Sequence, residues 1–328
     1  MRSPMNQSGR AMLLLLASAA LAAASTNSMP PPGAVNYVEG QVALDGQNLS
    51  AASVGSALLG TNQILTTSQG RAELLLTPGV FLRVGDNSEV RMVSPDLAAT
   101  QVELRHGSAT LEVTELFKEN NLSVLMGAAS TRIDKMGLYD FNADQPAISV
   151  LDGEATVSEG DRHVNLKKGH LVMLAAGAQF KAQSFKKDAV ESDPLYRWSK
   201  LRSEYEAQAN METAQTLVVN GGFGWYGPGW YWDPFWNFYA FLPGDGILYS
   251  PFGWGFYSPG YVWRAPHRIY YHYPVVGSQR SKPAPGVSVK TSGVSSGFRA
   301  GGGISGGVHG GGGGGFGGGS HGGGGGRR

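Results

Sequence analysis

Three histidines in the first half of the chain come nearest to a catalytic or metal-binding set. They are His106, His163 and His170, and the same half holds the acidic residues Asp134, Asp140 and Asp161. A catalytic triad or a metal site needs side chains that converge in space, which this scattered spacing does not indicate. No His-x-x-x-His or Gly-x-x-x-x-Gly-Lys motif occurs. We therefore predict a protein that is not an enzyme and that binds no cofactor and no metal ion.

Aromatic residues gather in one later segment, which is the best candidate for a binding surface. Between Phe223 and Tyr273 lie 21 of the 33 aromatic residues, interleaved with glycine and proline. Large rigid rings suit contacts with sugars, peptides or membrane interfaces. Three alternatives stay open: the rings cover the folded domain, they bind an envelope partner, or they act as stickers in a disordered segment. The candidate partner-binding residues are Trp225, Trp230, Trp232, Trp236, Trp254 and Trp263.

The N-terminus has the pattern of a secretory signal peptide. Arg2 and Arg10 precede an apolar run, and the small residues Ala22 and Ala24 suit a cleavage site. The run is shorter than the roughly 20 apolar residues that a membrane-spanning helix needs. We predict export to the periplasm or the cell surface, with cleavage near Ala24 and no transmembrane span in the mature chain. Since the chain has no cysteine, its own core must hold the fold.

Charge divides the remaining chain into an acidic body and a basic tail. Residues 25–245 hold 16 basic and 25 acidic side chains, whereas residues 246–328 hold eight basic and no acidic ones. Attraction to anionic envelope polymers and simple solvation of a disordered tail both explain the basic part. From Gly301 to Gly326 glycine fills 19 of 26 positions, so this piece cannot form a core. Its two histidines, His309 and His321, make a weak metal-ligand set, and export argues against nucleic acid as a partner.

The elements that must position these residues are short strands. Four times a Gly-x-Ala or Gly-x-Val unit begins an alternating apolar run, at Gly40, Gly70, Gly107 and Gly153, which is typical of stacked β-hairpins. Alternation predicts that Val102, Leu104, Leu111 and Val113 face a core while Glu103, Thr110 and Glu112 face water. The expected strands are 35–44, 62–66, 71–76, 80–84, 89–93, 101–105, 108–114, 122–126, 129–134, 137–141, 147–151, 154–158, 162–166 and 171–174. The fold class is mainly β, an antiparallel β-sandwich or roll or a short β-solenoid.

One amphipathic helix is expected after the strands. Asp193 is a good N-cap, Pro194 suits the first helical position, and the helix can run to about Leu217. Near-helical spacing predicts an apolar side of Leu195, Trp198, Leu201 and Tyr205. The opposite, polar side is expected to consist of Arg197, Lys200, Arg202, Glu204 and Glu206. The apolar side should pack across the β domain or against the chain that follows.

The β half resembles the FecR domain family. The strings that carry the resemblance are Gln69-Gly-Arg-Ala-Glu-Leu-Leu-Leu, Phe81-Leu-Arg-Val-Gly-Asp-Asn-Ser-Glu-Val-Arg-Met, Val102-Glu-Leu-Arg-His-Gly-Ser-Ala, Gly137-Leu-Tyr-Asp-Phe and Val150-Leu-Asp-Gly-Glu-Ala-Thr-Val. The resemblance covers roughly residues 35–175 and implies a β fold, an exported sensing or scaffolding module, and no catalytic residues. Founding members pass a signal through a membrane helix to a cytoplasmic anti-sigma segment. Here the β domain follows a signal peptide directly, so an exported protein without those segments is expected.

These expectations divide the chain into six parts. They are a signal peptide (1–24), a disordered leader (25–34), a FecR-like β domain (35–185), a helical segment (186–220), an aromatic Gly/Pro-rich extension (221–275) and a disordered basic Gly-rich tail (276–328). The predicted function is non-enzymatic sensing or binding of a protein or polysaccharide of the cell envelope. The alternative is a structural or surface-matrix protein that self-associates through its aromatic and glycine-rich C-terminal region.

Overall fold

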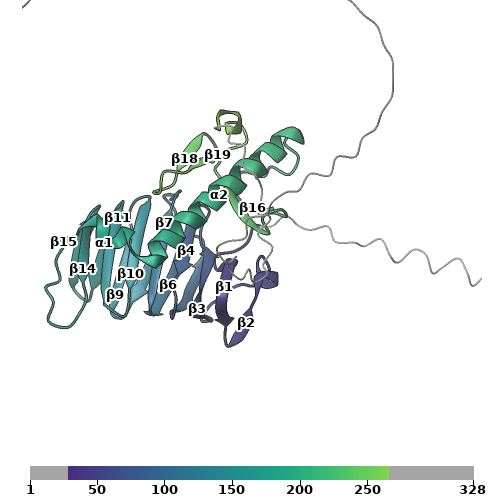
Figure 1. Ribbon diagram of the computed structural model, residues 1–328. Helices are drawn as coiled ribbons and strands as arrows, with labels where there is room; N and C mark the ends of the chain where they lie inside the picture. Colours follow the sequence, from purple (N-terminus) through teal and green to yellow (C-terminus); the bar gives the residue numbers. More distant parts are fainter. Residues whose placement is uncertain (1–28, 266–328) are drawn as a thin grey trace, which may run out of the picture. The chain divides into compact units, whose positions relative to one another are not determined.

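The computed structural model describes residues 29–265, and strands are its main element (Figure 1). The expected signal peptide and the glycine-rich tail lie outside the described residues. One sheet contains β1 (Ala34–Leu44), β2 (Gln47–Leu49), β3 (Ile64–Leu75), β4 (Val80–Val84), β5 (Glu89–Asp96), β6 (Ala99–His106), β7 (Ser108–Val113), β8 (Ser123–Met126), β9 (Ala129–Ile133), β10 (Gly137–Asn142), β11 (Ala147–Asp152), β12 (Glu154–Glu159), β13 (Arg162–Lys167), β14 (His170–Met173) and β15 (Gln183–Ser184). The sequence prediction of a mainly β fold is confirmed.

Neighbouring strands of this sheet are antiparallel, apart from the parallel pair β6 and β8. The order along the sheet is β13-β12-β9-β8-β6-β5-β3-β4-β7-β10-β11-β14-β15, and β1 pairs with β3 and β2. The two ends of this path approach each other, because β13 contacts both β11 and β14. The path therefore folds over into two layers, although the sheet does not close.

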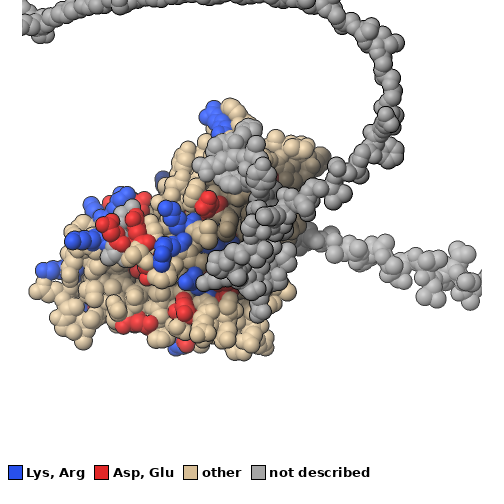
Figure 2. Space-filling model, viewed as in Figure 1, with Lys and Arg blue, Asp and Glu red and all other residues tan. Residues whose placement is uncertain are grey.

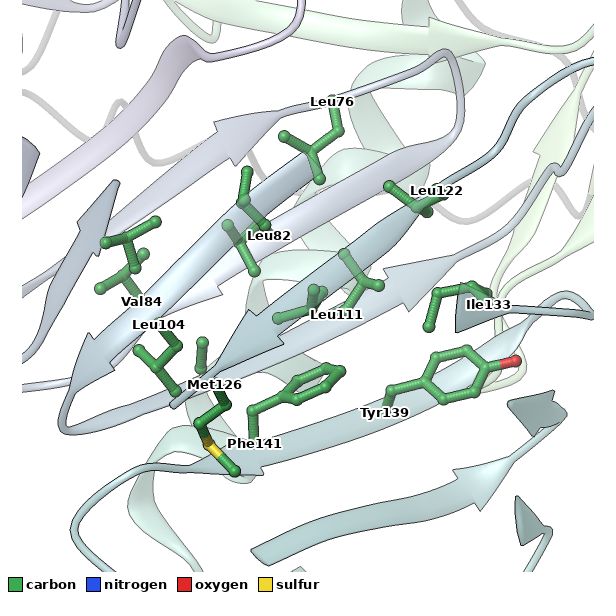
Figure 3. Close-up of a cluster of buried hydrophobic side chains, with 14 of the residues drawn as sticks. Leu76, Leu82, Val84, Leu104, Leu111, Leu122, Met126, Ile133, Tyr139 and Phe141 are labelled. Atoms are coloured by element: carbon green, nitrogen blue, oxygen red, sulfur yellow. The ribbon is translucent and has the colours of Figure 1, made fainter. Parts of the chain in front are cut away.

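The main core lies between the two layers (Figure 3). Leu82 on β4, Leu111 on β7 and Phe141 on β10 come from one layer, and Leu104 on β6 and Met126 on β8 from the other. All five side chains are nearly or fully buried. The alternation predicted for β6 and β7 is confirmed on the core side, since their apolar residues do enter this core.

Two glycines that the sequence placed at hairpin turns lie inside long strands instead. Gly40 lies within β1 and Gly70 within β3, and the pairing of these strands shifts register between Glu39 and Gln41. A Cβ on Gly40 would come within 2.1 Å of the Gln69 carbonyl oxygen, so the two backbones can approach only without it. The expected strands 62–66 and 71–76 are therefore one strand. Its first part pairs with β5 in one layer and its last part with β4 in the other.

Helix α2 (Pro194–Val219) lies across the outer face of the layer that contains β4 and β7, and the one-turn helix α1 (Lys187–Glu191) precedes it (Figure 1). The predicted N-cap is confirmed, because the Asp193 carboxylate accepts hydrogen bonds from the amides of Leu195 and Tyr196. The predicted faces are only partly right. Arg202 and Glu206, expected on the polar side, are buried, whereas Leu201 is 44% exposed.

The outer face of the sheet supplies the reason for this rotation of α2. Thr110 and Glu112 on β7, expected to face water, are buried beneath the helix. Glu112 needs hydrogen-bond partners there, so α2 turns polar residues toward the sheet. The wrong assignment arose because alternation separates two faces of a strand but does not say whether the second face is solvated.

The chain on either side of these elements is also packed. Residues 29–33, expected in a disordered or extended leader, join the fold through hydrogen bonds from the Gly33 amide to the Leu75 carbonyl and from the Leu59 amide to the Gly33 carbonyl. After α2 come two antiparallel hairpins, formed by β16 (Gly229–Asp233) with β17 (Phe238–Leu242) and by β18 (Ile247–Tyr249) with β19 (Gly255–Tyr257). The short 3-10 helices are η1 (Ala51–Ser53) and η2 (Val262–Arg264).

Candidate functional site

The outer face of the layer beneath α2 carries charged side chains at positions where strand alternation points away from the core. Glu73 on β3, Arg83 on β4 and Glu112 on β7 have no exposed surface. The neighbouring residues in each strand, such as Leu74, Leu82 and Leu111, enter the core between the layers. A buried charge is costly unless it is paired and hydrogen-bonded, so this face depends on what covers it.

Helix α2 completes a buried ion network with these residues. Arg83 Nε donates to Glu73 Oε2 over 2.8 Å, and its Nη1 donates to Glu112. Arg202 Nη2 on α2 lies 2.8 Å from both Glu73 Oε1 and Glu206 Oε1 and donates to them. The network therefore joins three strands of the sheet to the helix.

The surroundings shift the pKa values of the two glutamates bonded to Arg202 in opposite directions. Burial favours the neutral acid at Glu73, but Arg202 and Arg83 outweigh it and hold the pKa of Glu73 well below its ordinary value. Burial, together with the negative charge of Glu73, raises the pKa of Glu206 well above its ordinary value. The raised pKa favours the protonated form of Glu206, and the guanidinium groups of Arg83 and Arg202 pair with the carboxylates of Glu73 and Glu112.

Two buried asparagines attach the hairpins to this assembly. The Asn36 side chain on β1 accepts from the Tyr239 amide over 2.8 Å and donates to the Tyr239 carbonyl and to Glu206. Asn210 on α2 accepts from the Tyr257 amide over 2.7 Å and donates to the carbonyls of Phe241 and Tyr257. Each asparagine supplies the donor and acceptor that a neighbouring strand would supply, so β17 and β19 are fixed without a continuous ladder.

An aromatic pocket opens where β1, η1, α2 and the β16–β17 hairpin meet. Its volume is about 350 Å³. Its lining consists of Tyr37, Val38, Glu39, Ala51, Val54, Trp198, Leu201, Arg202, Tyr205, Trp236, Asn237 and Phe238. A concave, mostly apolar site with a few polar groups is the usual form of a small-ligand site. We take this aromatic pocket as the candidate functional site.

Arg202 connects the aromatic pocket to the ion network. Its guanidinium carbon lies 4.2 Å from the centre of the Tyr37 ring and 4.8 Å from that of Phe238, on top of its bonds to the two glutamates. The Nε atom of Arg202 is buried without a hydrogen-bond partner among the described residues. At the rim, Arg71 Nη1 lies 3.3 Å from Glu39 Oε1 and its guanidinium carbon lies 5.7 Å from the centre of the Trp198 ring.

The rings of the pocket are held by contacts of their own. Trp236 lies 5.8 Å from Tyr205, centre to centre, and its indole N–H donates to Glu212 Oε2 over 2.9 Å. Trp198 lies 6.2 Å from Tyr37. Such contacts restrict the rotamers of the rings, so the pocket exists before any ligand arrives.

The six tryptophans predicted as partner-binding residues have different surroundings. Trp236 lines the aromatic pocket. Trp232 and Trp263 are exposed, at 39% and 68%, and Trp225 and Trp254 are half-buried. Trp230 is fully buried, and its ring centre lies 5.1 Å from that of Phe81 and 5.6 Å from that of Phe241. For Trp230 the alternative that the rings cover the β domain is confirmed, and for residues 229–257 the disordered alternative is wrong.

The histidines considered for chemistry lie at the surface of the β domain. His106 Nδ1 is 2.7 Å from Asp144 Oδ1 and both side chains are largely exposed. His163 is exposed and His170 is partly exposed. Within residues 29–265 no group of three or more His, Cys, Asp or Glu is placed to hold a metal ion.

Sequence reasoning missed the residues that build the base of the site. Helical spacing of Ser199, Arg202, Ser203, Glu206 and Asn210 was the available signal, because these residues share one face of α2. The same spacing also suits a solvated face. Only the buried charges across the sheet distinguish the two cases.

Comparison with known proteins identifies part of the chain. Residues 62–156 match the model of the family described as FecR protein. No curated protein matches the sequence. No helix among residues 29–265 combines the length and apolar character needed to cross a membrane.

Two solved structures share a weak likeness with the chain. Both are of a proposed anti-sigma factor from Parabacteroides distasonis ATCC 8503, with 15% identity and TM-scores of 0.34 and 0.33. The likeness covers 39% and 38% of this chain and 62% and 60% of those chains, and it carries no weight for function. The family match, which runs from the turn before β3 into β12, is the finding that identifies this region: residues 62–156 form a FecR domain.

Proposed function

We propose that this protein is a non-enzymatic, exported FecR-like signalling module that binds a protein or polysaccharide of the cell envelope. The match to the FecR family supports the signalling module. The N-terminal sequence pattern supports export to the periplasm or the cell surface, with cleavage near Ala24. The observation that carries the binding function is the aromatic pocket, which is built jointly by the β domain, α2 and the β16–β17 hairpin.

The tryptophans of the extension contribute to this binding in different degrees. Trp236 lines the aromatic pocket, and Trp232 and Trp263 offer exposed ring faces outside it. Trp225 and Trp254 are half-buried and offer less. Trp230 has no surface for a partner, and its replacement would test the core instead.

The test is binding of the mature protein to isolated envelope material, measured by co-sedimentation. The variant Trp236→Ala should bind at least tenfold more weakly, because it removes one wall of the pocket. The matched control is Tyr249→Ala, which removes an exposed ring outside the pocket and should bind like the wild type. Circular dichroism must show that both variants are folded. Equal binding by all three proteins, or no binding by the wild type, would refute the proposal.

A second candidate function is self-association, which one observation favours. Val219 and Phe223, at and just beyond the end of α2, are each 85% exposed. Apolar side chains this exposed are typical of interaction surfaces. Sedimentation of the mature chain should then show oligomers that Phe223→Asp dissociates. A monomer at high concentration, both in the full chain and in the variant, would exclude this function.

A further inference from the structure

The size of the aromatic pocket limits what it can hold. Its volume of about 350 Å³ is near the lower end of the roughly 300–1,000 Å³ that ligand sites span. The body of a folded protein does not enter a space of this size. The occupant is therefore a small unit, either free or projecting from a larger molecule.

The charge of the pocket argues against an ionic occupant. Arg202 belongs to the lining, but its guanidinium group is already hydrogen-bonded to Glu73 and Glu206. At the rim, Glu39 is paired with Arg71. An anion would have to compete with the carboxylate of Glu73 for Arg202. A cation would have to compete with Arg71 for the carboxylate of Glu39. The pocket thus complements an uncharged ligand.

The mixture of ring faces and polar groups favours a ligand of mixed character. Trp198, Tyr205 and Trp236 are aromatic members of the lining, and Glu39 and Asn237 are polar members of the same lining. An apolar side chain in the pocket would desolvate these polar groups without pairing them. A sugar ring has C–H groups that pack on an aromatic face and hydroxyls at its edge that pair with such groups. Its chemistry therefore matches both parts of the lining.

We propose that the aromatic pocket binds a neutral saccharide of one or two hexose-sized rings, presented by an envelope polysaccharide. This inference rests on the proposed binding function and selects one of its two ligand classes. Trp236 provides the stacking face, and Asn237 and Glu39 at the mouth bind hydroxyl groups. Within residues 29–265 the side-chain amide of Asn237 makes one hydrogen bond, in which its Nδ2 donates to the Ala51 carbonyl oxygen over 3.5 Å. Its backbone has a φ of 55°, so Asn237→Gly removes the amide and keeps the left-handed conformation.

The experiment is a titration of the full mature protein with maltotriose, cellotriose and tri-N-acetylchitotriose. Intrinsic tryptophan fluorescence and saturation-transfer difference NMR report binding, and the tripeptide Gly-Trp-Gly is the peptide probe. At least one trisaccharide should bind with a Kd below about 10 mM. The variants Trp236→Ala and Asn237→Gly should each weaken this binding at least tenfold, and Tyr249→Ala should leave it unchanged.

Two results would overturn the inference. One is the absence of binding by all three trisaccharides up to about 10 mM. The other is binding of Gly-Trp-Gly that Trp236→Ala abolishes and that no trisaccharide displaces, which would assign the pocket to peptides. Either result leaves the binding function standing if the wild type still co-sediments with envelope material. Failure of that co-sedimentation refutes the proposed function itself.

Discussion

Replacement of Glu206 by glutamine tests the ion network most directly. Glu206 Oε1 accepts hydrogen bonds from Asn36 and Arg202. Glu206→Gln keeps that oxygen and places an N–H₂ group where the protonated acid carries its hydroxyl. Because burial and the charge of Glu73 favour the neutral acid at Glu206, the glutamine keeps the favoured charge and the shape of the side chain. We therefore expect a stabilised protein, although a buried member of a network is replaced.

The magnitude follows from proton linkage. In the unfolded chain Glu206 has its ordinary pKa of 4.5. Keeping it protonated above that pH costs the wild type at most 1.36 kcal/mol for each pH unit, so the cost at pH 7 has an upper limit of about 3 kcal/mol. Because folding raises the pKa of Glu206, its contribution to the stability of the protein is fully present below pH 4.5. That contribution is lost as the pH rises toward the pKa of the folded state. Glu206→Gln removes this loss.

The assay is equilibrium urea unfolding of the mature protein, followed by tryptophan fluorescence at pH 4 and pH 7. Glu206→Gln should raise the free energy of unfolding by as much as about 3 kcal/mol at pH 7 and change it little at pH 4. The comparison variant Glu73→Gln removes an ionised partner of both Arg83 and Arg202. It should lower the free energy of unfolding by about 3–5 kcal/mol. A Glu206→Gln protein that is less stable than the wild type at pH 7 would refute the neutral state of Glu206.

Three further predictions concern packing, backbone and pH. Trp230→Ala should lower the free energy of unfolding by about 3–5 kcal/mol, and the exposed Trp263→Ala by less than about 0.5 kcal/mol, measured by urea unfolding. Gly40→Ala should lower the thermal midpoint more than Gly46→Ala, because both have positive φ but only Gly40 meets backbone. Burial and the charge of Asp193 raise the pKa of Asp140 to about 7. Asp140→Asn should therefore stabilise above pH 7 and have no effect below pH 4 in thermal melts, and an opposite pH trend would contradict this.

The strands could be predicted from the sequence because their signals are local. Turn residues such as Asp152-Gly153 separate β11 from β12, and the apolar positions of β6 and β7 alternate as a core requires. What the alternation could not show is how many faces of the sheet are covered. Glu112 looked solvated because glutamate usually is, and only α2, which begins more than 80 residues later, makes its position buried.

The aromatic segment was harder to predict for a different reason. Its strands have only three to five residues, too short to establish a period of two among glycines and prolines. Their positions depend on side-chain amides of Asn36 and Asn210, which lie far away in the sequence. The aromatic composition pointed to Trp236, which lines the aromatic pocket, and its role in binding stays a prediction. It did not indicate Arg202 or Tyr37, which belong to the helix and to β1.

The charged side chains of the visible face lie mainly over α1 and the first half of α2, and few lie over β18 and β19 (Figure 2).

The buried charges beneath α2 explain why the helix and hairpins cannot be treated as an appendage of the FecR domain. A chain shortened after residue 193 would expose Phe81 and would leave Glu73, Arg83 and Glu112 with two guanidinium-to-carboxylate bonds but no cover. Hydration would satisfy those charges, but the area buried by Trp230 and α2 would be lost. Arg202 belongs to both the aromatic pocket and the network, so a ligand that contacts Arg202 also contacts a group bonded to β3. A shortened chain that keeps the aromatic pocket therefore has to include α2 and the β16–β17 hairpin.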